Sequence, residues 1–210
     1  MTIRLFDYFR SSAAYRVRIA LNLKGVAYER VPVNLLEGEQ ADEANRARNP
    51  QGLVPTLEID GQMLVQSLAI IDYLDARFPE PRLIPADPAQ RARAWAQALA
   101  VACDIHPVNN LRILKYLSHP LGVPQEARDA WYRHWVAEGF AGLERMAAGA
   151  GAFLGGERPG IADICLVPQM FNARRFDVDL APFPTLVRID AAAQALPAFA
   201  QAHPDRAKPA

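Results

Sequence analysis

The stretch FRSSAAYRVRIALNLKG, residues 9 to 25, contains the start, the body and the end of one helix. Ser11 and Ser12 stand at its beginning, where serine side chains often cap helix N-termini. The residues that recur at helical spacing are Val17, Ala20, Leu21 and Lys24. Gly25 is a stop signal. The stretch therefore predicts a helix over Ser12 to Leu23, preceded by the alternating, strand-like residues I-R-L-F-D-Y (3 to 8).

Further strands follow this helix. Residues 28 to 34, Y-E-R-V-P-V-N, predict a second strand, and Pro32 restricts it to a sheet edge because proline cannot donate to a ladder. Residues 56 to 65, T-L-E-I-D-G-Q-M-L-V, alternate around the pair Asp60-Gly61, which is favoured in tight type I′ turns. We therefore expect the third and fourth strands to be antiparallel neighbours.

The segment Q-S-L-A-I-I-D-Y-L-D, residues 66 to 75, predicts a helix with Ser67 at the N-cap position. Its buried side would be formed by Ile70, Ile71 and Leu74. The order strand, helix, strand, then strand, strand, helix is that of a thioredoxin-like sheet. A redox protein of this kind would carry Cys-x-x-Cys at the first helix, whereas this chain has Ser-Ser-Ala-Ala there.

The second half of the chain predicts helices alone. Residues 78 to 88, FPEPRLIPADP, predict a linker, because its prolines prevent both a helix and a central strand. Beyond it two apolar stripes recur at three and four residues, one of Ala92, Trp95, Ala96, Leu99 and Cys103, the other of Tyr132, Val136, Phe140, Leu143 and Ala147. The sequence thus predicts an α/β domain over residues 1–80 and an all-α domain over residues 89–210.

The charge balance argues against a nucleic-acid or membrane partner. The 23 basic and 23 acidic side chains cancel, so no net field attracts either polyanion. No run of about 18 uncharged apolar residues is present, and the N-terminus is charged, which favours a cytoplasmic protein. Cys103 and Cys165 show neither Cys-x-x-Cys spacing nor metal-ligand clustering, so we interpret them as small core residues and expect no metal.

Ser11 is the first candidate for chemistry. The first amides of a helix lack partners within the helix and carry a partial positive charge, so they can bind an anion. A thiol bound there would have a pKa below its free value of about 8.5, because only the thiolate gains these interactions. From the two serines alone, an ordinary N-cap and its neighbour is the preferred interpretation.

Two further segments offer polar groups beside the same sheet. Val54 and Pro55, in N-P-Q-G-L-V-P-T-L (49 to 57), enter a strand and could present backbone groups to an extended peptide. Gln66 and Ser67 stand at another helix N-terminus, which suits a carboxylate. Because these segments lie at the ends of strands one, three and four, we expect them to line one crevice.

The chain resembles the zeta class of glutathione transferases, the family of maleylacetoacetate isomerase. In the first half the likeness rests on S-S-x-x-x-R-V-R-I-A-L-x-L-K-G, N-P-x-x-x-V-P-T-L and Q-S-L-A-I-I-x-Y-L. In the second half it continues in I-H-P-V-N-N-L-R (105 to 112), A-D-I-C-L-V-P-Q (162 to 169) and A-R-R-F-x-V-D-L (173 to 180). These blocks cover nearly the whole chain in one order, which makes the resemblance specific.

The resemblance implies a thioredoxin-like domain, a C-terminal helical bundle, a homodimer and glutathione as the cofactor. Ser11 would donate a hydrogen bond to the glutathione sulfur, with Ser12 beside it. The other implied glutathione contacts are Gln40, Val54, Pro55, Gln66, Ser67, His106 and Asn110. His106 could instead act as a general acid, but a glutathione contact is the favoured interpretation. The family motif Ser-Ser-Cys is changed here, because Ala13 stands where that cysteine would be.

A maleyl dicarboxylate substrate would need cations, and arginine binds carboxylates through a planar fork of donors. The candidates are Arg175, then Arg10, then Arg112, with Arg175 matching the family's R-F-x-V-D-L block. The alternative for each is a surface arginine. Arg16 and Arg18 lie inside the first helix, and we assign them to packing or ion pairs. The resemblance thus makes Ser11, Ser12 and Arg175 the catalytic candidates.

The function implied is a glutathione-dependent cis–trans isomerase that converts maleylacetoacetate to fumarylacetoacetate in tyrosine and aromatic degradation. Neither a metal nor a carboxylate pair is required. An isomerase of maleylpyruvate, from gentisate or salicylate degradation, is an alternative with the same chemistry, and the sequence does not separate the two. A conjugating glutathione transferase is a broader alternative, and a non-catalytic binding module is another.

Overall fold

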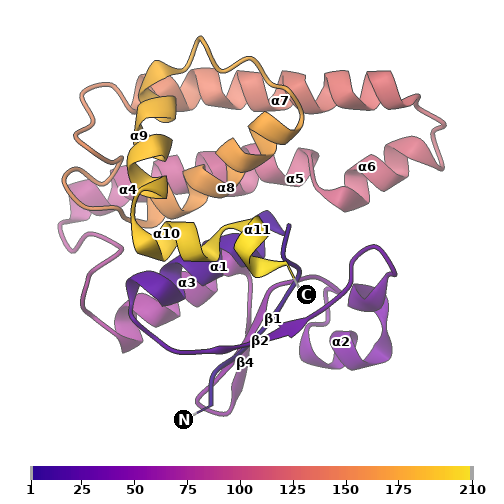
Figure 1. The fold of residues 1–210 in the computed structure, drawn as a ribbon, viewed down its shortest axis with the longest axis horizontal. Coiled ribbons are helices and arrows are strands. Elements are labelled where there is room, and N and C mark those ends of the chain that lie inside the picture. Colours follow the sequence, from indigo (N-terminus) through magenta and orange to yellow (C-terminus); the bar gives the residue numbers. More distant parts are fainter. Residues whose placement is uncertain (1, 209–210) are drawn as a thin grey trace. The chain divides into compact units, whose positions relative to one another are not determined.

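The computed structural model describes residues 2–208. The chain divides into two units, each with its own packing (Figure 1). Unit 1 comprises the residues up to Leu83 together with those from Ala195 onward, and unit 2 comprises Ile84–Gln194. The change from unit 1 to unit 2 falls inside the proline-rich segment 78 to 88.

Unit 1 is built on a four-stranded sheet with the order β2-β1-β3-β4. The strands are β1 (Arg4–Asp7), β2 (Glu29–Pro32), β3 (Thr56–Ile59) and β4 (Gln62–Val65). β1 is parallel to β2 and antiparallel to β3, and β3 is antiparallel to β4. The edge position of Pro32 and the hairpin are therefore confirmed. Asp60 and Gly61 have φ values of 52° and 75°, the left-handed conformation that a type I′ turn requires.

The first helix has the predicted bounds, α1 (Ser12–Leu23). The other helices of the N-terminal part are a 3₁₀ turn (Glu39–Ala41), α2 (Glu43–Arg48) and α3 (Ser67–Arg77). The predicted N-cap of α3 was wrong by one residue. Ser67 is the first helical residue, and the N-cap is Gln66, whose φ of 67° turns the chain sharply between β4 and α3.

The C-terminal helices α10 (Pro197–Ala202) and α11 (Pro204–Ala207) pack with unit 1, not with the helical domain to which the sequence assigned them. In Figure 1 they lie beside α1. This packing buries Phe199 and Ala202 of α10, and two polar contacts from α1 add to it. Arg18 Nε donates to the Ala202 carbonyl at 3.0 Å, and Asn22 Nδ2 donates to the Ala198 carbonyl at 2.9 Å.

Within its described bounds unit 2 is helical. Its elements are α4 (Pro88–Leu99), a π-helical turn (Ala100–Ile105), α5 (His106–Val108), α6 (Leu111–Ser118), α7 (Gln125–Met146), α8 (Ile161–Arg175) and α9 (Pro184–Gln194). Helix α8 is the core of the unit, because nearly every residue from Ile161 to Ala173 is buried. The predicted stripe of α7 is confirmed, with Tyr132, Val136, Phe140 and Leu143 all buried.

The predicted stripe of α4 was wrong. Helix α4 packs against α8 and buries Ala94, Gln97 and Ala98, whereas Ala92 and Ala96 are exposed and Leu99 is 39% exposed. The small alanines allow the backbones of α4 and α8 to approach closely. The alanine face is therefore buried, although the opposite face carries larger apolar residues. Cys165 is buried as expected, but Cys103 is exposed.

The described residues include no helix that combines the length and apolar character needed to cross a membrane. Nor do they bring together three or more histidine, cysteine or carboxylate side chains in a way that could bind a metal ion.

Candidate active site

One edge of the unit 1 sheet collects the candidate residues of the N-terminal half. Phe6 pairs with Thr56, and Thr56 pairs with Val65, so the end of β1, the start of β3 and the end of β4 are adjacent. The segments joined to these strand ends carry Ser11, Ser12, Val54, Pro55, Gln66 and Ser67. The separate sequence signals therefore belong to one edge.

Ser11 is the N-cap of α1. Its Oγ accepts a hydrogen bond from the Ala14 amide at 3.2 Å, and its own amide donates to the Tyr8 carbonyl at 2.8 Å. Ser11 is half-buried, whereas Ser12 is 6% exposed. The Ser11 hydroxyl hydrogen remains available for an acceptor beyond the helix, since Oγ acts as the acceptor in its cap contact. The helix N-terminus behind it favours a negative charge on that acceptor.

The loop before β3 presents the backbone of Val54. The Val54–Pro55 peptide bond is cis. The preceding Leu53 carbonyl accepts from Asn49 Nδ2 at 3.0 Å and from Asn45 Nδ2 at 3.4 Å, which fixes the loop. Within the described residues, neither the amide nor the carbonyl of Val54 has a hydrogen-bond partner. Both are thus available to pair with an extended peptide.

The N-terminus of α3 forms a second anion-binding place. Ser67 is 5% exposed, and its Oγ accepts from Nη1 of Arg16 at 3.3 Å. The sequence assigned Arg16 to packing or an ion pair; it is buried, and its guanidinium lies beside the first turn of α3. Gln66 Nε2 donates to Gln51 Oε1 at 2.7 Å, which orients the turn before that helix. A carboxylate at these amides would gain hydrogen bonds and a favourable field.

Gln40 lies in the 3₁₀ turn of unit 1. Its carbonyl accepts from Asn45 Nδ2 at 2.9 Å. Its side-chain Oε1 is buried and has no hydrogen-bond partner within the part of the chain that the structure describes. A buried acceptor without a donor is uncommon in native proteins, so Gln40 is suited to contact a ligand.

A buried ionic cluster fixes the turn that leads to Ser11. Asp7, with 0% exposure, accepts from Arg18 Nη1 at 2.7 Å and from Arg30 Nε and Nη2 at 3.2 and 3.0 Å. Arg18 Nη2 also donates to the Phe9 carbonyl at 2.9 Å. Burial lowers the pKa of the Arg18 guanidinium, while Asp7 acts to raise it. The cluster therefore connects β1 to the turn that precedes Ser11.

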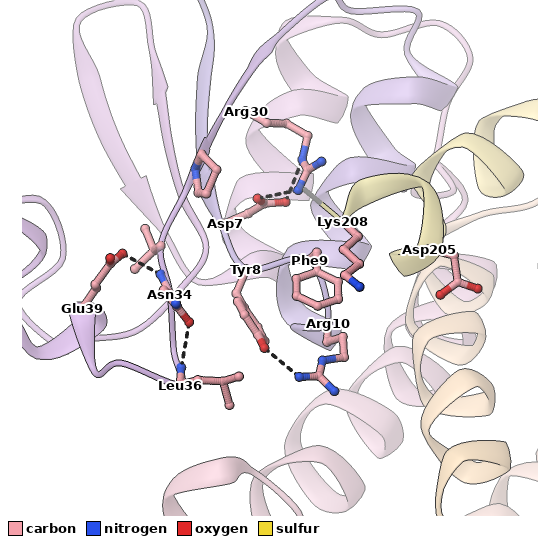
Figure 2. Close-up of a pocket in the computed structure, with 12 residues that line it drawn as sticks. Asp7, Tyr8, Phe9, Arg10, Arg30, Asn34, Leu36, Glu39, Asp205 and Lys208 are labelled. Carbon is pink, nitrogen blue, oxygen red and sulfur yellow. Dashed lines mark hydrogen bonds and ion pairs between the residues drawn. The ribbon is translucent and has the colours of Figure 1, made fainter. Parts of the chain in front are cut away.

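A cavity of about 650 Å³ is lined by this turn, from Asp7 to Arg10, and by Arg30 of the cluster (Figure 2). Arg10 Nη2 donates to the Tyr8 hydroxyl at 3.0 Å, and its guanidinium carbon lies 5.1 Å from the centre of the Phe9 ring. The charged residues that line the cavity are Arg10, Arg30, Lys208, Asp7, Glu39 and Asp205. Their formal charges cancel, so the cavity as a whole does not select an anion.

The candidates of unit 2 form two groups. In the first, His106 and Asn110 are in contact, with Asn110 Nδ2 3.3 Å from His106 Nε2, and Asn110 Oδ1 caps α6 by accepting from the Arg112 amide at 3.1 Å. Arg112 is exposed. A further candidate, which the sequence did not indicate, is Asn109, which is 6% exposed and whose side-chain nitrogen and oxygen have no hydrogen-bond partner among the described residues. No pattern in the sequence distinguishes it from Asn110.

The second group lies at the end of α8, where adjacent arginines differ. Arg174 forms an ion pair with Asp190, with 2.6 Å between Nη1 and Oδ2. Arg175 is exposed, and its guanidinium carbon lies 4.8 Å from the centre of the Phe176 ring. Arg174 thus stabilises the packing of α8 with α9, and Arg175 is the arginine that matches the R-F-x-V-D-L block of the sequence.

Comparison with known proteins gives consistent results. A family model described as the glutathione S-transferase N-terminal domain matches residues 5–82. The chain is 53% identical over 209 residues to a Vibrio cholerae protein named probable maleylacetoacetate isomerase, a match that covers 98% of this chain and 97% of that one.

Solved structures are similar over the whole chain. One is a holo structure of maleylpyruvate isomerase, described as a bacterial zeta-class glutathione S-transferase, with a TM-score of 0.95, 45% identity and 97% of each chain covered. Another is a maleylacetoacetate isomerase of Anaeromyxobacter dehalogenans with dicarboxyethyl glutathione and citrate in its active site. Its TM-score is 0.87 and its identity 48%, and the match covers 98% of this chain and 95% of that one.

Proposed function

Because the chain belongs to the zeta class of the glutathione S-transferases, we propose that it is a glutathione-dependent cis–trans isomerase of maleyl dicarboxylates, with maleylacetoacetate as the substrate. The observation that carries the proposal is the sheet edge of unit 1. There an N-capping serine, a backbone without partners and a second helix N-terminus are adjacent. These groups match the sulfur, the peptide backbone and a carboxylate of a small acidic thiol peptide.

The residues present fit glutathione. Ser11 would donate to the sulfur, with Ser12 beside it. Val54, preceding Pro55, would pair with the peptide backbone, and Gln66 and Ser67 would bind the γ-glutamyl carboxylate. Gln40 offers its unpartnered buried oxygen, and His106 and Asn110 would supply further contacts. Bound glutathione would supply a thiolate that adds reversibly to the conjugated double bond, which can rotate while it is single.

The chain itself would perform three tasks. The N-terminus of α1 and the Ser11 hydroxyl lower the pKa of the thiol. Arg175 forms a fork of hydrogen bonds with a substrate carboxylate, and Arg10 and Arg112 are the next candidates for the other carboxylate. Ala13 provides no thiol beside the serines, and the proposed nucleophile is the thiolate of glutathione. The relative that binds dicarboxyethyl glutathione supports this pairing of a thiol cofactor with a dicarboxylate.

The thiol pKa tests this assignment directly. We expect the sulfur of bound glutathione, titrated by its thiolate absorbance, to ionise below its free value. A charge-assisted hydrogen bond contributes about 1.5–3 kcal/mol, so Ser11→Ala should raise that pKa by roughly one to two units. Ser118→Ala, at the end of α6, is the matched control and should change nothing. An unchanged thiol pKa in Ser11→Ala would refute the role of Ser11.

The substrate is separated from its alternatives by product analysis. Purified protein would be supplied with glutathione and either maleylacetoacetate or maleylpyruvate, and the free glutathione would be counted. An isomerase regenerates glutathione at every turnover, whereas a conjugating transferase consumes one molecule per product. Faster turnover of maleylpyruvate would favour the alternative substrate, and inactivity on both would exclude the isomerase.

We also infer a homodimer and a cytoplasmic location. The outer face of α4, with Leu99 39% exposed beside the half-buried Trp95, is an apolar surface that a second copy of the chain would cover. The cytosol keeps glutathione reduced, as the reaction requires. Light scattering should give twice the mass of one chain, and Leu99→Glu should shift it towards one chain if α4 forms the interface.

A further inference from the structure

Arg175 lies at the end of a column of aromatic side chains. The rings of Tyr132, from α7, and Phe176, which follows α8, are stacked with 3.7 Å between their centres and 9° between their planes. The guanidinium carbon of Arg175 lies 4.8 Å from the centre of the Phe176 ring. Since Tyr132 covers one face of Phe176, the opposite face is the one available to the guanidinium.

The base of this column is rigid. Tyr132 is 3% exposed and Gln169, beside it in α8, is 1% exposed, so neither side chain can move without repacking the core. Phe176 is half-buried and Arg175 is exposed. The column thus runs from the core of unit 2 to its surface, and its last member carries the charge.

The column also remains neutral beneath that charge. Burial raises the pKa of the Tyr132 hydroxyl to about 12, while Arg175 and Gln169 act in the opposite direction. The phenol is therefore protonated at physiological pH. A carboxylate in place of the Tyr132 phenol would form an ion pair with Arg175, in the way that Asp190 does with Arg174. Such an ion pair would compete with a substrate carboxylate for the Arg175 guanidinium.

We propose that Tyr132 and Phe176 are positioning residues, which fix the Arg175 guanidinium in advance in the orientation that binds a substrate carboxylate. This inference rests on the proposed function, in which Arg175 contacts the substrate. An arginine side chain has many rotamers, and part of that conformational freedom is lost when it binds a ligand. A stack that restricts the side chain beforehand lowers this cost, and the ring face also attracts the cation.

The test measures binding, so it does not depend on turnover. Malonate, a non-reactive dicarboxylate, is titrated by calorimetry into the glutathione-saturated protein. We expect Phe176→Leu and Tyr132→Leu to weaken malonate binding by about three- to tenfold, because the stack is lost. Tyr132→Phe keeps the ring and should bind as the parent chain does. The Kd of glutathione should stay unchanged in all three variants.

A double-mutant cycle separates positioning from general destabilisation. In an Arg175→Ala background, Phe176→Leu should have no further effect on malonate affinity, although it still lowers the melting temperature by the same amount. Full additivity of the two effects on affinity would overturn the inference. If Phe176→Leu does not fold by circular dichroism, Phe176→Met is used in its place.

The two proposals can fail separately. If Arg175→Ala weakens malonate binding but Phe176→Leu and Tyr132→Leu do not, the positioning role is overturned and the role of Arg175 stands. If Arg175→Ala binds malonate as tightly as the parent chain, both roles are overturned. A chain that binds malonate as predicted but isomerises neither substrate keeps the positioning role and loses the isomerase.

Discussion

Replacing Arg18 by methionine is the most informative single perturbation of unit 1. Arg18 is 1% exposed and donates from three nitrogens, to Asp7, to the Phe9 carbonyl and to the Ala202 carbonyl, at 2.7, 2.9 and 3.0 Å. It therefore joins β1, the turn before Ser11 and helix α10. Methionine has a similar length and is apolar, so Arg18→Met removes the donors and leaves most of the packing.

The cost can be worked from these contacts. Removing one partner of a buried ion pair typically costs about 3–5 kcal/mol, because the other charge stays buried. Asp7 keeps Arg30, whose side chain is 27% exposed, which favours the lower end. The Phe9 and Ala202 carbonyls also lose a charged donor, which increases the cost. We expect roughly 3–5 kcal/mol, and at about 2–4 °C per kcal/mol for a chain of this size the melting temperature should fall by roughly 6–20 °C.

Urea unfolding followed by circular dichroism gives this free energy. Arg77→Met is the matched control, since Arg77 also pairs with a carboxylate, Asp60, at 3.1 Å, but its side chain is 48% exposed. An exposed pair contributes much less than a buried one, because solvent screens the two charges. Proteolysis near Ala202 should also be faster in Arg18→Met than in the parent chain. Equal costs for the two variants would show that the buried cluster does not stabilise the fold, and would refute the argument.

Further expectations concern single contacts. Burial acts to raise the pKa of Glu144, but hydrogen bonds from the first turn of α9 and a nearby arginine outweigh it, so the pKa is lowered in the folded protein. The ionised Glu144 side chain therefore stabilises the fold above the unfolded pKa of about 4.3, and this stabilisation is lost as the pH falls through the lower folded pKa. The melting-temperature difference between the parent chain and Glu144→Gln should therefore shrink below about pH 4. A Cβ at Gly139 would clash with the Ile105 side chain, so Gly139→Ala should cost about 1–3 kcal/mol in urea unfolding, and adding Ile105→Ala should cost less than the sum. Lys24 donates to Asp75 and to two carbonyls at 2.6–2.7 Å with its side chain fully buried, so Lys24→Met should cost about 3–5 kcal/mol in the same assay, and a cost below 1 kcal/mol would contradict this.

The sequence predicted those parts of the fold that depend on local signals. The bounds of α1, the turn at Asp60-Gly61 and the edge position of Pro32 follow from capping, from backbone conformation and from a missing donor. All three act within a few residues. They can therefore be recognised without knowing what packs against the segment.

The errors concern features that depend on distant partners. Periodicity indicated one apolar face of α4, that of Trp95 and Leu99, whereas the packing of Ala94 and Ala98 on α8 buries another face. The C-terminal helices pack with unit 1 because of Arg18 and Asn22, more than 170 residues earlier in the chain. No local pattern contains this information.

In the candidate site, too, local motifs indicated some residues, whereas contacts between distant residues were not predicted. Motifs indicated the residues that would touch a ligand, whereas both arginines inside α1 were assigned to packing or ion pairs, and the Arg18–Asp7 ion pair confirms that assignment for Arg18. The structure gives each a second effect, because Arg16 donates to Ser67 and Arg18 donates to the Phe9 carbonyl. A site that stabilises an anion needs hydrogen-bond donors that are already oriented before the anion binds. If the donors must reorient, the free-energy cost of that reorientation reduces the net stabilisation of the anion.

Burying a guanidinium is costly unless its N–H groups have acceptors. In the cluster of Asp7, Arg18 and Arg30 the buried guanidinium has its acceptors, and the cluster still has more positive than negative groups. One carboxylate, Asp7, accepts from two arginines, Arg18 and Arg30, so the group has one net positive charge beneath the turn that leads to Ser11. That charge acts in the same direction as the dipole of α1 and favours a thiolate over a thiol. The buried arginine that stabilises the fold would then also lower the thiol pKa on which turnover depends. Arg18→Met should therefore raise the thiol pKa of bound glutathione as well as destabilise the fold.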